Sequence, residues 1–520
     1  MKKFRYLIFL FLMIGFISSC EEAVNPVPTI ESMSPASKIP NMPSFYLTIK
    51  GTDFTRSSNI VFNGVFKDTT YVKNTELKTM ITAEDLNNNA GFSASYLSAN
   101  GTISIPVYVS NPKPGGGKSE IVYFIVRNKF TFSEHKPVAE LQKDTYSPFL
   151  LCDSNNRIYM TFYFDSEDFY EICYTSTETG GESFSTKTIM NQLSKLNSDV
   201  GSPGLAIDAN ERLCLLWNYR RATEDTDNWH MWGLYSTEGV ISFNTPLNVY
   251  QTVELINTYK MNIFGTGNLF CAWTVINEEE VGVVFFRRST DFGENWTDIK
   301  QLNNRSCGDS NLGFEMDNTG NMFIVWNAVN KNTGREGLYY TTTSDFGDNF
   351  TTPSPILVGD SANDVLKFQK STLGPDGRIY ITWWERNMTD PEIFKLKIAK
   401  FDSTWSGYDI STIAEFDGLF TNQLPNVGLD IDDNGNLYVV THDQNKILHF
   451  YKSTGEIDKF SEAADAQDWD MAGSFDFILD NYGSMVLIYT KEVEYEILNE
   501  DTGETEKKKI IEPFYVQTNE

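Results

Sequence analysis

The sequence predicts an all-β protein in which a small β-sandwich precedes a β-propeller. Two observations carry this prediction. From Val27 to about residue 127, short segments of alternating apolar and polar residues are separated by turn residues, as in a sandwich of short strands. From residue 130 to residue 520, a turn followed by an apolar strand recurs about every 55 residues, which fits one four-stranded propeller blade.

Residues 1–19 are predicted to be an export signal and not an element of the fold. In "MKKFRYLIFLFLMIGFISSC", basic residues precede an apolar run that is too short to span a bilayer comfortably. The run ends at Cys20 in a string that resembles the bacterial lipobox, whose cysteine becomes the lipidated first residue of the mature protein. An ordinary secretory signal that happens to contain this cysteine is the alternative. Residues 20–26 are then a linker, and its acidic Glu21 and Glu22 resemble the tag that sends Bacteroidetes-type lipoproteins to the outer face of the outer membrane.

Charge and composition exclude several classes of partner. The formal net charge is −28, so nucleic acid and broad anionic surfaces are poor partners. Four of the cysteines beyond Cys20 stand in apolar stretches and are interpreted as small buried hydrophobic residues, and the four histidines show no spacing typical of a ligand pair. The string "DIDDNG" from Asp430 resembles half a calcium loop, but its twelfth position is Thr441 and not glutamate, so a hairpin turn explains it. We expect no metal and no cofactor.

Residues 27–127 contain several motifs in a fixed order. They read "PTIESMSP", then "FYLTIKGTDFTRSSNIVFNG", "TELKTMITAEDL" and "IPVYVSNPKPGGGKSEIVYFIV". The segment resembles the IPT/TIG family of immunoglobulin-like domains, with Gly51 and Phe54 placed as in that family. The resemblance implies a stalk or contact domain, and no residue in the segment suggests chemistry.

Seven copies of the turn and strand can be aligned in residues 130–520. They are "CDSNNRIYMTF", "IDANERLCLLW", "FGTGNLFCAW", "MDNTGNMFIVW", "GPDGRIYITWW", "IDDNGNLYVVT" and "LDNYGSMVLIY". Each copy would supply the hairpin between the first and second strands of one blade. Four second strands carry a tryptophan that is expected to fill the space between blades, namely Trp217, Trp273, Trp326 and Trp383.

The ring is predicted to have seven blades and to be closed by an N-terminal strand. The segment from Phe130 to Leu141 resembles the fourth strands of later blades, although no blade precedes it. After the seventh turn only two long strand-like stretches remain, so the last blade lacks a fourth strand. If the N-terminal segment supplies that strand, no sheet edge is left unpaired.

Two octapeptides, "STDFGENW" and "TSDFGDNF", lie between third and fourth strands and resemble the Asp-box of BNR-repeat propellers. In this resemblance the aspartates bond the backbone N–H groups of their own turn, the glycines adopt positive φ, and the aromatic residues pack beneath. A motif that recurs in several blades cannot assemble one catalytic centre, so the boxes are interpreted as scaffolding. The residues concerned are Ser289, Asp291, Gly293, Trp296, Asp345, Gly347 and Phe350.

Asp-box propellers include sialidases, and such a site needs an arginine cluster, a tyrosine paired with a glutamate, and an acid/base aspartate. None of these can be placed in the sequence, so no catalytic constellation is identified. Ligand binding is instead predicted for the loops that follow second strands or precede first strands, where aromatic planes stand beside Arg, Asn and Asp. The candidate ligand-binding residues are Tyr219, Arg220, Trp229, Trp384, Arg386 and Trp469.

Three hypotheses for the function follow. The first is a lipid-anchored protein of the outer membrane, facing the cell exterior, that captures a glycan beside an uptake system such as an outer-membrane importer. The second is a protein-interaction or assembly lipoprotein without a glycan ligand, because the same loop composition also suits a protein partner. The third is a sialidase-like glycoside hydrolase or a polysaccharide lyase, which the missing catalytic motifs disfavour.

Overall fold

The computed structural model divides into two compact units, Met1–Asn128 and Lys129–Asn519, which are described separately. No helix in the described ranges is long and apolar enough to cross a membrane, and the signal segment and Cys20 lie outside those ranges. The described residues are 24–38, 44–87, 102–127, 132–138, 144–166, 168–177, 184–185, 188–194, 198–208, 210–222, 227–237, 240–243, 246–277, 282–303, 307–329, 334–360, 363–387, 390, 393–417, 424–454, 456–481, 483–498 and 505–518.

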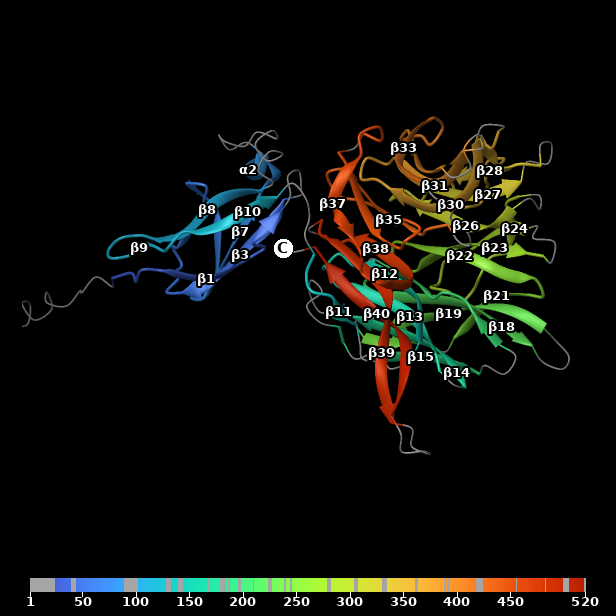
Figure 1. Ribbon diagram of the computed structural model, residues 1–520, viewed down its shortest axis with the longest axis horizontal. Helices are drawn as coiled ribbons and strands as arrows, with labels where there is room; N and C mark the ends of the chain where they lie inside the picture. The colour runs from blue at the N-terminus through green and yellow to red at the C-terminus, as the bar shows by residue number, and fades with distance from the viewer. Residues whose placement is uncertain are drawn as a thin grey trace, which may run out of the picture. The chain divides into compact units, whose positions relative to one another are not determined.

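The first unit is a β-sandwich, as predicted (Figure 1). One sheet has the strand order β1 (Thr29–Ser34), β3 (Phe45–Thr52), β7 (Glu76–Ile81) and β6 (Thr69–Lys73). The other has the order β2 (Ser37–Lys38), β10 (Val122–Arg127), β8 (Thr102–Asn111), β4 (Asn59–Phe62) and β5 (Val65–Phe66), with β9 (Gly117–Lys118) beside β8 and a short helix α2 (Ala83–Asn87) elsewhere in the unit.

The sandwich core follows from the alternation of residues along its strands. Phe45, Leu47 and Ile49 on β3 are buried, while the residues between them face outward. Gly51 is required where β3 meets β1, because a Cβ atom there would lie 2.0 Å from the carbonyl oxygen of Thr29. Membership of the IPT/TIG family stays a prediction.

The second unit is a seven-bladed propeller, which confirms the predicted fold (Figure 1). Blade 1 comprises β12 (Asp144–Cys152), β13 (Ile158–Asp165), β14 (Phe169–Ser176) and β15 (Thr188–Ser194). Blade 2 comprises β16 (Ser198–Val200), β17 (Gly204–Ile207), β18 (Leu213–Ala222), β19 (Asp227–Thr237), β20 (Val240–Phe243) and β21 (Leu247–Thr252). Blade 3 comprises β22 (Leu255–Phe264), β23 (Asn268–Ile276), β24 (Gly282–Ser289) and β25 (Lys300–Gln301).

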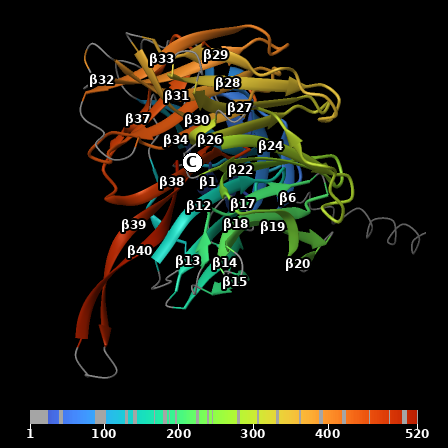
Figure 2. The same cartoon turned by 90° about the vertical axis from the view of Figure 1, so that its right-hand side faces the viewer.

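Blades 4 to 7 repeat the same order of strands. Blade 4 comprises β26 (Cys307–Met316), β27 (Met322–Val329), β28 (Glu336–Thr343) and β29 (Ser354–Val358), and blade 5 comprises β30 (Asn363–Leu373), β31 (Ile379–Asn387), β32 (Ile393–Phe401) and β33 (Tyr408–Asp417). Blade 6 comprises β34 (Val427–Ile431), β35 (Leu437–His442), β36 (Leu448–Ser453) and β37 (Ser461–Gln467). Blade 7 comprises β38 (Met471–Leu479), β39 (Met485–Leu498), β40 (Thr505–Gln517) and β11 (Lys136–Pro137). The hairpin of β39 and β40 extends well beyond the body of its blade (Figure 2).

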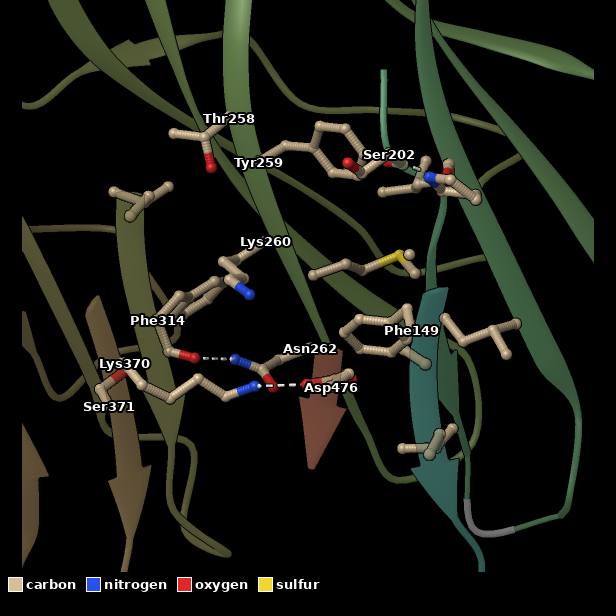
Figure 3. Close-up of a pocket in the computed structure, with 18 of the residues that line it drawn as sticks. Phe149, Ser202, Thr258, Tyr259, Lys260, Asn262, Phe314, Lys370, Ser371 and Asp476 are labelled. Carbon is tan, nitrogen blue, oxygen red and sulfur yellow. Dashed lines mark hydrogen bonds and ion pairs between the residues drawn. The ribbon is translucent and has the colours of Figure 1, made fainter. Parts of the chain in front are cut away.

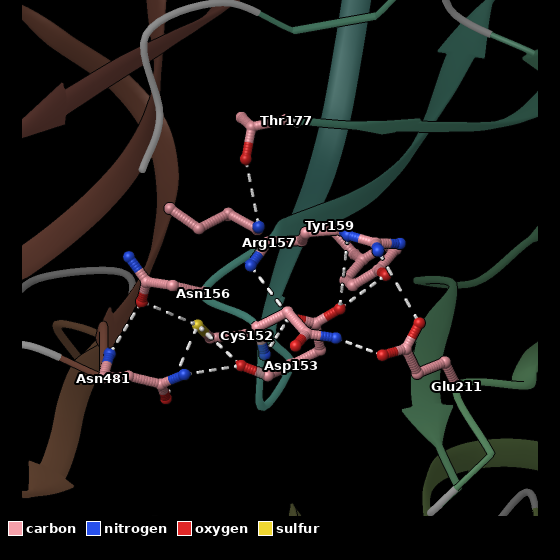
Figure 4. Close-up of polar contacts among 10 residues, drawn as sticks. Cys152, Asp153, Asn156, Arg157, Tyr159, Thr177, Glu211 and Asn481 are labelled. Atoms are coloured by element: carbon pink, nitrogen blue, oxygen red, sulfur yellow. Dashed lines mark hydrogen bonds and ion pairs between the residues drawn. The ribbon is translucent and has the colours of Figure 1, made fainter. Parts of the chain in front are cut away.

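The repeated turn between first and second strands is built around an aspartate. In blade 1, Asp153 Oδ1 accepts hydrogen bonds from the backbone N–H groups of Asn155 at 2.9 Å and Arg157 at 2.8 Å. The same turn contacts both neighbouring blades (Figure 4): Asn481 donates its N–H to the side chain of Asn156 at 2.8 Å, and Arg157 forms an ion pair with Glu211 at 3.7 Å. The turns therefore order each hairpin and also connect adjacent blades.

Packing between blades uses the predicted tryptophans. Each is at most 1% exposed and belongs to a core cluster that combines two neighbouring blades. The four residues are Trp217, Trp273, Trp326 and Trp383. Among the described residues, the indole N–H groups of the first three have no hydrogen-bond partner, so these three act through packing area alone.

The first segment of the second unit closes the ring, as predicted. Lys136 and Pro137 pair with Tyr515 and Phe514 on β40, so β11 is the fourth strand of blade 7 (Figure 1). Beside this pairing, Val138 donates its N–H to a carbonyl oxygen at 3.0 Å, and its side chain is 7% exposed within the core shared by blades 7 and 1. The predicted segment was longer than β11, and its residues 130–131 and 139–141 lie outside the described ranges.

Candidate functional site

Two of the residues predicted to bind a ligand are buried in the propeller. Trp384 is fully buried, and its indole N–H donates to the carbonyl oxygen of Pro425 at 2.9 Å. Trp469 is 6% exposed and packs against the rings of His135 and Tyr489, with centroid distances of 4.7 and 5.2 Å. In this structure neither ring offers a free face to a sugar, so the burial argues against the predicted ligand-binding role of these two residues, which stays a prediction.

The other four candidates lie in two separate blades. Arg220 and Trp229 face each other across the β18–β19 hairpin of blade 2, where Tyr219 is 7% exposed and stacks on His230 at 5.1 Å. Arg386 lies in blade 5 and forms an ion pair with Asp364 at 3.0 Å. The predicted residues therefore do not come together as one site.

Both octapeptides form turns held by their own side chains. In the first, the Ser289 hydroxyl donates to Asp291 at 2.7 Å and accepts the N–H of Gly293 at 2.9 Å, and Asp291 accepts the N–H of Asn295 at 2.8 Å. Gly293 has φ +89°, and a Cβ atom there would lie 2.3 Å from the ring of Tyr235.

The second octapeptide repeats these contacts. Thr343 donates to Asp345 at 2.6 Å, Asp345 accepts the N–H of Asn349 at 2.9 Å, and Gly347 has φ +82°. The aromatic residues of the two turns, Trp296 and Phe350, are half-buried against the blade cores.

A cavity of about 630 Å³ lies between the first strands of the seven blades (Figure 3). Its wall comes almost entirely from β12, β17, β22, β26, β30, β34 and β38 and the residues just before them, so it follows the central channel of the propeller. Each blade contributes to the lining, for example through Phe149, Gly204, Lys260, Glu315, Lys370, Asn426 and Asp476. This volume falls within the range of typical small-ligand sites.

The first strands are irregular where they line this cavity. The pairing register shifts between Tyr146 and Phe149 in β12 and between Ile256 and Thr258 in β22, and shifts of the same kind occur in β26, β30 and β38. Most of these shifts lie in the first half of their strands, and β30 has a second one between Phe368 and Lys370. Because bulges redirect side chains and concentrate next to functional sites, their position marks the channel as the candidate site.

Charged side chains from several blades meet in the channel. Lys370 Nζ lies 3.3 Å from Asp476 Oδ1, and the other oxygen of Asp476 accepts the N–H of Leu150 at 2.8 Å. Glu315 accepts a hydrogen bond from the Ser371 hydroxyl at 2.5 Å. These contacts join blades 5, 7, 1 and 4 around the cavity.

The ionisable groups of the channel have perturbed pKa values. Burial, together with the charge of Lys370, lowers the pKa of Lys260 to about 8. Burial raises the pKa of the Glu315 carboxyl and raises that of Asp430 to about 6, although Asp430 accepts the N–H groups of Leu479 and Ile431. Such shifts are typical of binding and catalytic sites, and here they coincide with the cavity.

The remaining reactive groups do not extend this site. Among the described residues, no group of three or more His, Cys, Asp or Glu side chains could hold a metal ion. Asp432, in the string that resembles a calcium loop, accepts the N–H groups of Asn434 and Asn436 at 2.9 Å within a hairpin turn. Burial raises the pKa of the Cys152 thiol to about 12, so it stays protonated and unreactive at neutral pH.

Sequence reasoning missed the channel residues. They stand on the strand before each repeat turn, where a lysine, an amide or a carboxylate interrupts an otherwise apolar run, as Lys260 and Asn262 do in "YKMNIF". Polar residues on the innermost strand of a blade were the signal that could have located them.

No family model and no curated protein matches the chain. Solved structures with a similar fold include a protein of unknown function from Dyadobacter fermentans, at 12% identity over 75% of this chain and 99% of that one, with a TM-score of 0.42. A polysaccharide lyase described as an ulvan lyase is 11% identical over 73% and 95%, with a TM-score of 0.49. An α-L-arabinofuranosidase from Fusarium graminearum is 10% identical over 74% and 97%, with a TM-score of 0.39. At such identities the likeness concerns the fold alone.

Proposed function

We propose that the protein is a lipid-anchored protein of the outer cell surface that binds a glycan in the channel cavity of its propeller and presents it to a neighbouring uptake system. The observation that carries the proposal is the composition of the cavity wall. Asn257, Asn262 and Asn426 line the same cavity as Phe149 and Phe475, and the Asn262 amide also donates to the carbonyl oxygen of Phe314 at 2.9 Å.

This combination suits a sugar for a physical reason. The CH face of a pyranose is apolar and stacks on an aromatic ring, while its hydroxyl groups need planar partners that can both donate and accept hydrogen bonds. A primary amide meets that need. The location at the outer membrane rests on the string around Cys20 and its acidic neighbours.

Binding can be tested by titrating the full mature chain with oligosaccharides of different composition and measuring the heat of binding. Phe149→Ala and Asn257→Ala remove one ring and one amide from the cavity, and each is expected to weaken binding by about tenfold or more. Trp229→Ala, on the rim of blade 2, is the matched control. Loss of affinity in Trp229→Ala with wild-type affinity in both cavity variants would place the site on the rim and contradict the proposal.

A second candidate is a glycoside hydrolase or polysaccharide lyase that uses the same cavity. It is favoured by one observation, the raised pKa of the Glu315 carboxyl beside the lowered pKa of the Lys260 ammonium. Incubation with the oligosaccharides that bind distinguishes the two functions. Intact oligosaccharide after prolonged incubation supports capture, whereas new reducing ends or unsaturated sugars that disappear in Glu315→Gln support catalysis.

A further inference from the structure

We propose that the glycan carries an anionic group, a carboxylate or a sulfate, and that the ammonium group of Lys260 binds it inside the channel. This inference rests on the proposed function and names the chemical class of the ligand. It concerns one subsite, formed by Lys260 on β22 and Phe149 on β12.

The ammonium group of Lys260 lacks a counter-ion in the described structure. It points into the cavity, and it forms no hydrogen bond or ion pair with any described residue (Figure 3). Nζ lies over the ring of Phe149, 6.0 Å from the ring centroid. A half-buried cation without an ion pair is partly desolvated, and an anionic ligand would offset that cost.

The other charged groups that face Lys260 already have partners. Asp476 is bound by Lys370 and by a backbone N–H group, and Glu315 accepts the Ser371 hydroxyl. Asp430, behind the wall, accepts two backbone N–H groups at 2.7 and 2.9 Å. None of these three carboxylates forms an ion pair or hydrogen bond with Lys260, although the charges of Glu315 and Asp476 raise its pKa.

The lining as a whole carries an excess of positive charge. A third lysine, Lys367, stands on the cavity wall beside Lys260 and Lys370, against the two carboxylates of Glu315 and Asp476. The whole chain has a net charge of −28, so this cavity is a local exception. Solvent ions screen the exposed charges outside within about 10 Å, which leaves the lysines of the lining to determine the charge preference of the ligand.

The distance between ring and ammonium suits an acidic sugar. Because Lys260 Nζ lies over one face of the Phe149 ring, a pyranose that stacks on this face at about 4.5 Å has to be offset toward the ring edge, with its substituents extending toward the ammonium group. A carboxylate or sulfate on its edge can then approach Lys260 Nζ, 6.0 Å from the same ring centroid, to hydrogen-bond distance. A neutral sugar could stack there but would leave the ammonium without a counter-ion.

The test compares oligosaccharides of matched length on the wild-type protein. The probes are oligogalacturonate, sulfated oligogalactan and unmodified oligogalactan, and the readout is the dissociation constant. We expect one of the two acidic probes to bind at least about tenfold more tightly than the neutral one, and the preference between them identifies the anionic group. Lys260→Met should remove this difference, and Lys260→Arg should keep it. Lys459→Met, which removes an exposed positive charge paired with Glu456, should leave it unchanged.

Each outcome decides between the two proposals. Equal binding of acidic and neutral probes overturns the anion subsite and leaves glycan capture in place, whereas absence of binding for all three probes overturns both. An acidic preference that survives in a folded Lys260→Met overturns the assignment of this lysine. If Lys260→Met does not fold, the pH profile of the wild type decides: affinity for the acidic probe should fall as the pH rises above about 8, and a flat profile contradicts the role of Lys260.

Discussion

Replacing Lys260 by methionine should stabilise the folded propeller. The perturbation removes an ammonium group that has no described ion pair and keeps an unbranched side chain of similar length. Burial and Lys370 lower the pKa of Lys260 from the ordinary value of 10.5 to about 8. At 1.36 kcal/mol for each pH unit, that difference sets an upper limit of about 3 kcal/mol for the cost of the charged form. Because the side chain keeps contact with water in the channel, we expect a gain of about 1–2 kcal/mol.

The stability gained by Lys260→Met should depend on pH. A lysine whose pKa is lower in the folded than in the unfolded state lowers the free energy of unfolding, and this loss is complete at pH values below the folded pKa. Between about pH 8 and 10.5 the unfolded chain holds more protons than the folded one, so wild-type stability contributed by this group rises with pH. The advantage of Lys260→Met should therefore be largest near pH 7 and should shrink toward pH 10.

Denaturant unfolding at these two pH values, followed by tryptophan fluorescence, provides the assay. The variant should have the higher midpoint at neutral pH, and Lys459→Met, which alters an exposed ion pair, should show no measurable change. A variant that is less stable than wild type near pH 7, or whose advantage does not depend on pH, would refute the reasoning that Lys260 is a half-buried cation without an ion pair.

Three further predictions concern the anchor, the turns and the ring. Cys20→Ala should release the protein from the membrane fraction into the soluble one, and unchanged fractionation would contradict lipidation. Asp291→Ala should lower the free energy of unfolding by on the order of 1–2 kcal/mol and leave ligand affinity unchanged, with Glu294→Ala in the same turn as the neutral control. Deleting Phe130 to Leu141 should expose the edge of β40 and cause aggregation in size-exclusion chromatography, whereas a well-folded monomer would show that the ring does not need β11.

The architecture could be predicted because its signals are local and repeat. In blades 1, 2, 4 and 6 the aspartate of the hairpin turn satisfies backbone groups only two and four residues away, so a similar short string recurs along the chain. The closing strand could be predicted because the last repeat lacked a fourth strand, and the segment before the first repeat contained a strand that belonged to no other blade. Both arguments need only the order of residues along the chain.

The site could not be predicted in this way, because its residues come from different blades. More than a hundred residues separate Lys260 from Lys370 along the chain, and more than a hundred separate Lys370 from Asp476. Only the closed ring brings the three residues to one cavity. Trp384 illustrates the opposite error. The residues around Trp384 have the composition of a sugar-binding loop, but residues of a neighbouring blade bury its ring. The sequence of its own strand gives no sign of this burial.

The closing strand also determines how the propeller responds to pulling. Tension that reaches the propeller through the first 128 residues arrives at Phe132, which forms a single bridge with Thr518, and passes from there to β11, whose ladder has two residue pairs with β40. By comparison, β39 and β40 share thirteen pairs. A pull from that side therefore loads a short ladder at the closure of the ring, and blade 7 would lose its fourth strand before β39 separates from β40. The mechanical strength of this ladder sets the largest force under which the last blade keeps all four of its strands.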